Sequence, residues 1–446
     1  MKAFKAYDIR GVWGEDLSPE IAYKTGYFIV EILNAKRILI GRDIRNSSPE
    51  MHKNILQGLI DAGAEVYDAG ICTTPMVYWA TGKYNFDASL MITASHNPKE
   101  YNGIKVSAKN VRPIGYDDGL NVIERNIESA KDTPFKDGGS MQTIEIRENY
   151  LDFLRSYIDF SNELNVSIDF SSGMAALFAK DLFPDANCIN EIPDGNFPAH
   201  EPNPLEPENQ EQIKEQVLNN NSDIGVIFDG DADRVMFVDE KGKFISPDLI
   251  IALLGHYFLE GSDSKNTVVQ DIRTSKAVGE YLSQFDTNVE IWKVGRAFGA
   301  SKLKELNAIY GGELAGHYYF RDFYFSDSGL LAAIMVLNIV DKFRLKGIKL
   351  SKLISNISPY HNTGEVNFKI EDKKGAMDAV RDHFMRSQNP ERYLDFDGYR
   401  LDFHDWWFNI RPSNTEPYLR FLAEAKSQEL LEEKTNIIYS ILKRFK

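Results

Sequence analysis

The pattern of apolar and polar positions repeats three times along this chain. Apolar runs at 38–40, 166–170 and 267–271 each end in a polar turn, and a segment with recurring apolar side chains follows each turn. A buried-type strand, a turn and an amphipathic helix in this order are typical of a parallel βαβ unit. The repetition predicts three related α/β domains in series, and a single large α/β sheet is the alternative.

The pattern changes after residue 363. A strand, a helix, further strands and a final helix at 428–445 are expected there, which is typical of a smaller α+β domain. Polar stretches at 131–140 and 356–363 have the composition of linkers. The sequence therefore predicts three α/β units followed by one smaller unit of a different class.

Three Ser-Pro pairs, at 18–19, 48–49 and 246–247, are each followed by an acidic residue. Serine at an N-cap, proline at the first helical position and an acid beside the positive helix end all favour a helix start. We therefore expect helices to begin at these three points. The proline-dense stretch 193–207 can hold neither a helix nor a strand ladder, and we expect it at the surface.

The composition is that of a globular protein. Hydrophobic residues make up 43% of the 446 and charged residues 26%, which excludes a disordered or fibrous chain. The net charge of -15 argues against non-specific binding to nucleic acid or to an anionic membrane. The longest apolar stretch, 330–340, is too short to span a bilayer. Two cysteines and an N-terminus without a secretory pattern lead us to expect a cytoplasmic protein.

Three carboxylates at alternate positions form the most informative short motif. Asp229, Asp231 and Asp233 lie between two predicted strands, and Arg234 follows at once. Such carboxylates repel one another unless a cation lies among them, and their hard oxygen atoms favour Mg²⁺ or Ca²⁺. The adjacent guanidinium indicates an anionic group, such as a phosphate, beside the metal. A solvated acidic turn is the alternative.

An EF-hand calcium loop is a second interpretation of the same motif. Glu240 lies eleven residues after Asp229, as the spacing of such a loop requires. However, Arg234 occupies the position that needs glycine, and the flanking segments are predicted strands rather than helices. The strand-bound metal loop is therefore the preferred interpretation.

Ser95 and His96 follow directly after the predicted strand 88–92. A serine beside a histidine suggests a hydrolase, but the Gly-x-Ser-x-Gly elbow is absent and adjacent residues rarely form a nucleophile and its base. A second interpretation is that Ser95 carries a phosphoryl group, whose charge the metal cluster and a cation such as Lys105 would neutralise. An ordinary polar loop is the third, because an Asn-Pro pair follows.

A segment near the C-terminus has the residue types of a phosphate-binding loop. Arg411 and Arg420 bracket Ser413, Asn414 and Thr415 in a predicted turn between strands. Guanidinium groups with hydroxyl and amide donors bind phosphate well, although similar residues also occur in ordinary turns. No Walker A sequence is present, which excludes a P-loop nucleotide hydrolase.

Two further segments are weaker candidates. Glu313 and His317 lie in a Gly-Gly-Glu-Leu-Ala-Gly-His segment, where the carboxylate can accept hydrogen bonds from sugar hydroxyls and the imidazole can donate one. Arg10 precedes a glycine in the Tyr-Asp-Ile-Arg-Gly segment at 7–11. Solvated loop residues are the alternative in both cases.

The five segments occur together in a specific order. The Tyr-Asp-Ile-Arg-Gly segment, the Ser95 loop, the triple-aspartate loop, the Glu313 loop and the Arg411 loop together resemble the α-D-phosphohexomutase superfamily, specifically its bacterial phosphomannomutase/phosphoglucomutase group. The resemblance covers essentially the whole chain and implies four domains around a central cleft. The implied boundaries are 1–141 for the phosphoserine domain, 142–245 for the metal domain, 246–357 for the sugar-recognition domain and 358–446 for the phosphate-binding domain.

The resemblance also implies roles for individual residues. Ser95 would be the phosphoserine, and the catalytic group would further comprise Arg10, His96 and Lys105. The implied Mg²⁺ ligands are Ser95, Asp229, Asp231 and Asp233, and the implied substrate contacts are Tyr7, Arg234, Lys293, Glu313, His317, Arg411, Ser413, Asn414, Thr415 and Arg420.

The activity implied by the resemblance is a Mg²⁺-dependent interconversion of hexose 1-phosphates and 6-phosphates. Mannose, glucose or both would be the sugar, and a hexose 1,6-bisphosphate would be both intermediate and activator. A donor serine is needed because the O1 and O6 atoms lie too far apart for direct transfer. Hexose phosphates are the expected partners, and a monomer or homodimer is the expected assembly.

One departure from the family pattern bears on the sugar. The family often has serine where this chain has Ala315, so one hydrogen bond to the sugar is missing and the choice between mannose and glucose stays open. Phosphoglucosamine mutase is an alternative, but those enzymes usually open with a Gly-Thr-Asp-Gly-Ile-Arg-Gly type segment. A Mg²⁺-dependent sugar-phosphate phosphatase and a catalytically silent sugar-phosphate or Ca²⁺-binding protein rank below the mutase.

Overall fold

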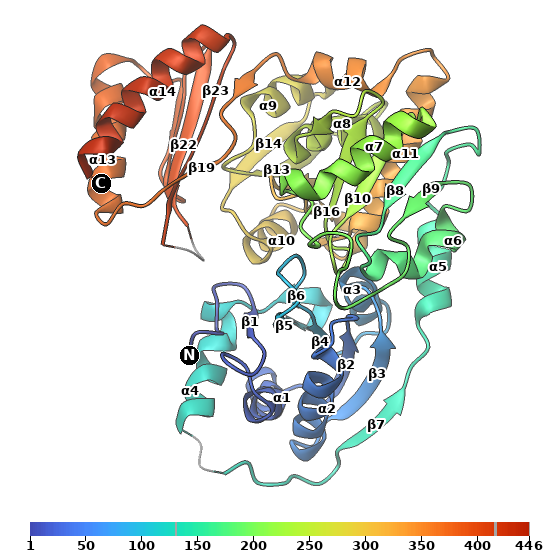
Figure 1. Cartoon of the computed structure of the whole chain (residues 1–446). Coiled ribbons are helices and arrows are strands. Elements are labelled where there is room, and N and C mark those ends of the chain that lie inside the picture. Colours follow the sequence, from blue (N-terminus) through green and yellow to red (C-terminus); the bar gives the residue numbers. More distant parts are fainter. Residues whose placement is uncertain (130–131, 414–416, 446) are drawn as a thin grey trace.

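The computed structural model describes residues 1–129, 132–413 and 417–445, which form four units that follow one another along the chain (Figure 1). Each unit has its own sheet. The first three combine mixed sheets with helices, and the fourth is an antiparallel sheet that packs against two helices. The predicted fold class, three α/β domains in series and a smaller α+β domain, is confirmed.

The first unit contains a seven-stranded mixed sheet. Its helices and strands are β1 (Ile9–Val12), α1 (Pro19–Leu33), β2 (Arg37–Arg42), α2 (Ser48–Asp61), β3 (Glu65–Ile71), α3 (Thr74–Lys83), β4 (Ala88–Ile92), β5 (Tyr101–Ala108), β6 (Arg112–Pro113), α4 (Asn121–Ser129) and β7 (Ser140–Thr143). The order is β1-β5-β4-β2-β3-β7, with β6 beside β5. The parallel strands β2 and β4 are almost wholly buried, as expected for strands between helical layers. The loop after β4 therefore lies at the carboxyl edge of the sheet, where α/β proteins place binding sites.

The second unit has a five-stranded sheet of order β12-β11-β10-β8-β9. Its elements are α5 (Arg147–Arg155), β8 (Val166–Asp169), α6 (Ala179–Leu182), β9 (Asn187–Ile189), α7 (Glu211–Asn220), β10 (Ile224–Phe228), β11 (Val235–Asp239) and β12 (Phe244–Ile245). β10 and β11 pair antiparallel, with Phe228 opposite Val235. The three aspartates therefore lie in a tight loop at one edge of this sheet.

The third unit has a five-stranded sheet of order β14-β13-β15-β16-β17. Its elements are α8 (Pro247–Phe258), β13 (Thr267–Asp271), α9 (Lys276–Leu282), β14 (Asn288–Trp292), α10 (Arg296–Glu305), β15 (Tyr310–Gly312), β16 (Tyr318–Phe320), β17 (Ser326–Asp327), α11 (Gly329–Arg344) and α12 (Leu350–Ile357). β15 and β16 pair antiparallel, so the Glu313 segment is the loop of a hairpin.

The fourth unit has a six-stranded sheet of order β18-β23-β22-β21-β20, with β19 beside β23. Its elements are β18 (His361–Asn362), β19 (Val366–Phe368), α13 (Lys373–Ser387), β20 (Arg392–Leu394), β21 (Tyr399–Asp402), β22 (Trp406–Pro412), β23 (Leu419–Ala425) and α14 (Gln428–Leu442). Arg411 and Arg420 are opposite each other at the end of the β22–β23 hairpin. In Figure 1 this end of the hairpin points toward the first unit.

One hydrophobic core runs through the first three units. It joins side chains of α3, α5, β8 and β10 to α11, in which the run 330–337 is wholly buried. The apolar stretch 330–340 is thus the centre of the core, and no helix in the described part of the chain meets the length and apolarity that a bilayer span requires. The fourth unit has a separate core of its own residues. The ring pair of Trp292 and Phe396, with centroids 5.5 Å apart, is one of its contacts with the third unit.

Helices begin at all three expected points, but only one of the three serines caps its helix through its side chain. Ser18 caps α1, since its hydroxyl accepts a hydrogen bond from the Ile21 amide at 3.2 Å. α2 includes Ser48 instead of starting after it, and Ser246 directs its hydroxyl to Asp248 instead of capping α8. After β8 the chain forms a 3₁₀ helix and then the four-residue α6. A longer helix is excluded there because Pro184 disfavours helical geometry at the residue before it.

The proline-dense stretch 193–207 is not simply a surface loop. Phe197 is buried, and its ring lies 5.0 Å from the guanidinium of Arg45 in the first unit. Asn46 donates a hydrogen bond to Asn196 at 2.9 Å in the same region. The expectation of a surface loop is therefore wrong for this part, because an aromatic side chain anchors the stretch between two units.

A buried arginine joins the third and fourth units. Arg400 on β21 donates hydrogen bonds to the carbonyls of Ile272 at 2.9 Å and Thr274 at 2.6 Å. Its guanidinium also lies 4.0 Å from the ring of Trp407 on β22. This side chain therefore anchors the fourth unit to the turn that follows β13.

A buried carboxyl lies in the same interface. Glu424 on β23 accepts hydrogen bonds from the Ser275 hydroxyl at 2.5 Å and from the Trp407 indole at 2.7 Å. Burial, assisted by repulsion from Asp248, raises the pKa of Glu424 from 4.5 to about 7. The protonation of this carboxyl is therefore linked to the docking of the fourth unit.

The pH dependence of stability tests this linkage. Because the pKa of Glu424 is raised on folding, its stabilising contribution is complete below pH 4.5 and is lost as the pH rises through 7. We expect the wild type to lose up to about 3 kcal/mol more stability between pH 5 and pH 8 than Glu424→Gln, which cannot ionise. Thermal unfolding across this range, with the exposed Glu432→Gln as the control, measures the difference. The same slope in wild type and Glu424→Gln would contradict the prediction.

Candidate active site

Ser95 lies in a tightly held loop after β4. Its backbone amide donates a hydrogen bond to the Thr93 hydroxyl at 2.9 Å, and the Asn97 amide closes a turn onto the Ala94 carbonyl at 3.0 Å. Ser95 has a φ of 50°, a left-handed conformation that non-glycine residues adopt infrequently. A side chain at Gly230 would place its Cβ 2.5 Å from the Ser95 carbonyl oxygen, so glycine lets the triple-aspartate loop approach this loop closely.

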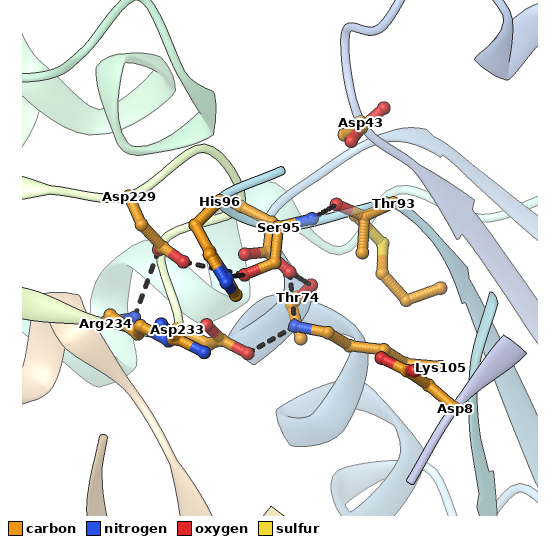
Figure 2. A network of polar contacts seen from close by, with 12 residues as sticks. Asp8, Asp43, Thr74, Thr93, Ser95, His96, Lys105, Asp229, Asp233 and Arg234 are labelled. Carbon is orange, nitrogen blue, oxygen red and sulfur yellow. Dashed lines mark hydrogen bonds and ion pairs between the residues drawn. The ribbon is translucent and has the colours of Figure 1, made fainter. Parts of the chain in front are cut away.

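The Ser95 hydroxyl faces the triple-aspartate loop, as Figure 2 shows. It donates a hydrogen bond to Asp229 Oδ2 at 2.8 Å, and its oxygen lies 3.3 Å from His96 Nδ1. Lys105 Nζ donates to Asp231 Oδ2 at 2.6 Å and also to Asp233. Residues predicted from two distant segments therefore meet between the first and second units.

The three aspartates have the properties of a cation site. All three are fully buried, and one carboxylate oxygen of each lies within 4.8 Å of the others. The Oδ1 atoms of Asp231 and Asp233 are buried without a hydrogen-bond partner among the described residues. Burial, together with repulsion from the other two carboxylates, raises the pKa of Asp229 well above its usual value. A divalent cation would satisfy these oxygens and offset the repulsion, so the residues present fit Mg²⁺.

The EF-hand interpretation is excluded. Strands β10 and β11, not helices, flank the motif. Glu240 is directed elsewhere, since it accepts hydrogen bonds from the Ser351 hydroxyl at 2.6 Å and from the Ser351 amide at 3.0 Å.

Three cationic side chains surround the cluster. Burial opposes the charge on Lys105, but Asp231 and Asp233 outweigh it and raise its pKa. Arg10 pairs with Asp8 and donates to the Asn97 side chain at 2.6 Å, which places it against the Ser95 loop. The third cation is Arg234, whose amide donates to Asp229 Oδ1 at 3.1 Å.

His96 contributes no positive charge at neutral pH. Burial, reinforced by the nearby cations Arg234 and Arg10, lowers its pKa well below the usual value. The neutral imidazole can therefore accept a hydrogen bond from the Ser95 hydroxyl.

The Glu313 loop joins the cluster from the third unit. His317 Nε2 lies 3.2 Å from Arg234 Nε and 3.5 Å from Asp233 Oδ1, and its Nδ1 lies 3.1 Å from Glu313 Oε2. Glu313 also accepts a hydrogen bond from the Gly295 amide at 3.0 Å. Burial disfavours the Glu313 carboxylate, but His317 and Arg273 lower its pKa to about 2. A charged acceptor therefore lies beside the triple-aspartate loop.

Tyr7 and Lys293 meet around a third side chain. The ring of Phe298 packs edge-to-face on Tyr7 with centroids 5.7 Å apart, and Lys293 Nζ lies 5.5 Å from the same ring. The Tyr7 hydroxyl donates to the Val294 carbonyl at 3.0 Å. Predicted substrate contacts from the first and third units are therefore neighbours.

The predicted phosphate-binding arginines are held by carboxylates of the fourth unit. Arg411 is buried and donates to Asp397 Oδ1 at 3.2 Å, while Arg420 donates to Glu365 Oε1 at 2.8 Å. The other oxygen of Asp397 accepts a hydrogen bond from the Val294 amide at 2.9 Å, which links this hairpin to the Lys293 segment. Ser413 lies at the end of β22, and Asn414 and Thr415 lie outside the described residues.

The structure adds residues that the sequence did not single out. The Thr74 hydroxyl, at the start of α3, donates to Asp231 Oδ2 at 2.5 Å. Arg296 donates to Asp327 at 3.0 Å and stacks 3.8 Å from the ring of Tyr78, which links the third unit to the first. Arg45, in the connection after β2, donates a hydrogen bond to the Ser95 carbonyl at 2.8 Å. None of these residues lies in a motif with recognisable metal or phosphate chemistry.

Comparison with protein families gives a continuous match along the chain. Four domain models described as phosphoglucomutase/phosphomannomutase match in order: alpha/beta/alpha domain I at residues 1–133, domain II at 148–242, domain III at 246–360 and the C-terminal domain at 365–438.

Individual proteins agree with this match. Phosphomannomutase of Escherichia coli K12 is 35% identical over 99% of both chains. The structure of a phosphoglucomutase/phosphomannomutase family protein of Burkholderia thailandensis superposes with a TM-score of 0.90 at 27% identity, covering 99% of this chain and 97% of the other. N-acetylphosphoglucosamine mutase of Aspergillus fumigatus, solved with GlcNAc-6P and magnesium, shares the fold at 13% identity, with a TM-score of 0.57 and coverage of 92% and 83%.

The order of the four domains, the identity over the full length and the meeting of the Ser95 and triple-aspartate loops all lead to one assignment. The chain belongs to the phosphoglucomutase/phosphomannomutase family and is a phosphohexomutase, an isomerase of hexose phosphates.

Proposed function

We propose that this enzyme interconverts mannose 1-phosphate and mannose 6-phosphate, glucose 1-phosphate and glucose 6-phosphate, or both pairs, through phosphorylated Ser95 and a hexose 1,6-bisphosphate. One observation carries the proposal: the Ser95 hydroxyl lies 2.8 Å from Asp229, beside two further buried carboxylates and Lys105. The name of the Escherichia coli relative supports mannose as one sugar.

Ser95, Asp229, Asp231 and Asp233 would hold Mg²⁺. The buried Oδ1 atom of Asp231, which has no hydrogen-bond partner among the described residues, supports this assignment, as does the magnesium in the Aspergillus fumigatus structure. When bound, Mg²⁺ supplies Lewis-acid stabilisation of charge on phosphoryl oxygens.

The side chains around Ser95 would bind and orient the transferring phosphoryl group. Lys105, Arg10 and Arg234 provide fixed positive charge where negative charge accumulates during transfer. The Ser95 proton has two acceptors within reach, Asp229 at 2.8 Å and the neutral imidazole of His96 at 3.3 Å. Either acceptor would take the Ser95 proton when the hydroxyl oxygen receives a phosphoryl group.

The third and fourth units would position the sugar. Glu313 and His317 offer a charged acceptor and an imidazole to vicinal hydroxyls, with Tyr7 and Lys293 nearby. Binding the sugar by its non-reacting phosphate brings the reacting oxygen to Ser95 without a bimolecular encounter. The proposed phosphate contacts are Arg411, Ser413, Asn414, Thr415 and Arg420.

The intermediate has to turn around between the two transfers. A central cleft between the four domains, with boundaries proposed at 1–141, 142–245, 246–357 and 358–446, would give it room. The strand β7 crosses the first of these boundaries. A separate core in the fourth unit is compatible with movement of that unit during the cycle. A bisphosphate of this kind, glucose 1,6-bisphosphate, is bound in a second Aspergillus fumigatus structure and is the proposed activator.

The proposed setting is the cytoplasm, with hexose phosphates as partners and a monomer or homodimer as the assembly. Both cysteines are free, which is compatible with a reducing compartment.

Replacement of the serine tests the phosphoenzyme. We expect Ser95→Ala to lower mutase turnover by at least about 10³-fold, because no other hydroxyl occupies this position. Wild type incubated with glucose 1,6-bisphosphate should gain one phosphoryl group, roughly 80 Da, and Ser95→Ala should gain none by intact mass. Ser107→Ala is the matched control, since Ser107 is a buried serine on β5 outside the proposed site.

Two outcomes of the same assay would favour another activity. Release of inorganic phosphate in excess of isomer would indicate a phosphatase. Sugar-phosphate binding without turnover, unchanged in Ser95→Ala, would indicate a binding protein.

Metal binding is tested by stability. Mg²⁺ that binds only the folded chain at 100 times its dissociation constant should stabilise the wild type by about 2.7 kcal/mol. Asp231→Asn should lose most of this gain, whereas Asp185→Asn, the same change at an exposed aspartate, should keep it. Thermal unfolding with and without Mg²⁺ measures the shift. Equal shifts in both variants would exclude the triple-aspartate site.

The sugar preference is tested at the Glu313 loop. Ala315→Ser should supply a hydroxyl donor to the sugar and change the mannose-to-glucose ratio of kcat/KM by about 10-fold. Rates on mannose, glucose and glucosamine 1-phosphates, measured for both proteins, check this. A wild type that prefers glucosamine 1-phosphate would instead identify a phosphoglucosamine mutase, and an unchanged ratio would show that residue 315 does not contact the sugar.

A further inference from the structure

Arg45, in the connection between β2 and α2, is a charged side chain with no exposed surface. One of its terminal nitrogens donates to the carbonyls of Ser95 at 2.8 Å and Asn97 at 2.7 Å. The other donates to the carbonyls of Pro98 at 2.7 Å and Tyr101 at 3.1 Å. One guanidinium thus binds four backbone oxygens of the loop that carries the proposed phosphoserine.

The guanidinium is itself fixed from two further directions. Asp43 Oδ2 lies 3.2 Å from Arg45 Nε, and the other Asp43 oxygen accepts hydrogen bonds from the Arg45 amide and the Ser48 hydroxyl. The ring of Phe197, from the proline-dense stretch of the second unit, lies 5.0 Å from the guanidinium. Side chains of both the first and the second units therefore hold the Arg45 guanidinium in place.

The loop needs this support for a physical reason. Ser95 has a left-handed φ of 50°, and a buried carbonyl without a donor would favour rearrangement of the loop. The Asn97 side chain, on the same loop, accepts a hydrogen bond from Arg10 at 2.6 Å. Movement of the loop carbonyls would therefore displace both the Ser95 hydroxyl and the Arg10 guanidinium.

We propose that Arg45 is a positioning residue for phosphoryl transfer, which holds the Ser95 loop so that Ser95 faces Asp229 and Arg10 faces the reacting oxygens. Phe197 completes this support from the second unit. The proposal rests on the proposed function of Ser95. Lysine cannot replace Arg45, because an ammonium has three donors around one nitrogen and cannot reproduce the planar fork that reaches four carbonyls.

The main test compares Arg45→Lys with Arg37→Lys. Arg37 is the control, since it is an arginine of the preceding strand β2 and its guanidinium lies 5.2 and 5.1 Å from the rings of Tyr67 and Phe86, away from the proposed site. We expect Arg45→Lys to lower kcat by about 100-fold, the scale of a 1 Å misplacement, with KM changed less than about threefold. Arg37→Lys should change kcat less than about twofold.

A second measurement separates positioning from loss of stability. The rate at which glucose 1,6-bisphosphate phosphorylates Ser95, followed by intact mass in a single turnover, should fall in Arg45→Lys as much as kcat does. If the lower rate results from a misplaced Ser95 loop and not from unfolding, it persists at temperatures at which circular dichroism shows that Arg45→Lys is fully folded. An equal kcat in Arg45→Lys and Arg37→Lys would overturn the proposal.

Phe197→Leu provides a variant that keeps the apolar packing. It should lower kcat by about fivefold, and its effect should be non-additive with that of Arg45→Lys, because both act on one guanidinium. If Arg45→Lys does not fold, the kcat of Phe197→Leu is the deciding measurement. A kcat equal to that of the wild type would overturn the proposal. Failure of wild type to phosphorylate Ser95 would overturn the proposed function and this inference together. An active, phosphorylated wild type beside a fully active Arg45→Lys would overturn this inference alone.

Discussion

Three buried carboxylates facing a serine of another domain are the constraint on which the rest of this structure depends. Asp229, Asp231 and Asp233 have no solvent to stabilise their charge, so the surrounding protein has to compensate it. Lys105 reaches two of them, and Arg234 binds the third through its backbone amide. This charge balance joins the first and second units, because neither has a complete set of partners alone.

Close backbone approach makes that balance possible. Gly230 lies against the Ser95 carbonyl, and Gly329, at the start of α11, lies against the carbonyls of Ala232 and Arg234, where a Cβ would be within 2.8 Å of both. Helix α11 therefore supports the triple-aspartate loop from one side, and the Ser95 loop meets it from the other. The shared core of the first three units holds this geometry, while the fourth unit, with its own core, contributes from outside it.

Much of the fold was predictable from local patterns. The strands 88–92, 224–228 and 267–271 were recognised because buried parallel strands consist of short apolar runs, and the change of class after residue 363 followed from the altered pattern. The prediction of a helix in the second repeat was less accurate, because Pro184 limits the segment after β8 to a 3₁₀ helix and the four-residue α6. Ser48 and Ser246 do not cap helices, since Ser246 binds Asp248 and α2 starts one residue early.

The candidate site divides in the same way. The sequence by itself determined the chemical types, namely alternating carboxylates, a serine at a strand end and paired arginines, because these motifs are local. The family resemblance implied one shared site for Ser95 and the three aspartates, but only the tertiary structure decided the individual contacts: Ser95 with Asp229, Arg234 with His317, and Tyr7 with the Lys293 segment. It also revealed Arg45, Thr74 and Phe197, whose roles come from contacts across 50 residues or more or between domains. Such contacts leave no local pattern, because they depend on how separate units pack and not on the spacing of neighbours.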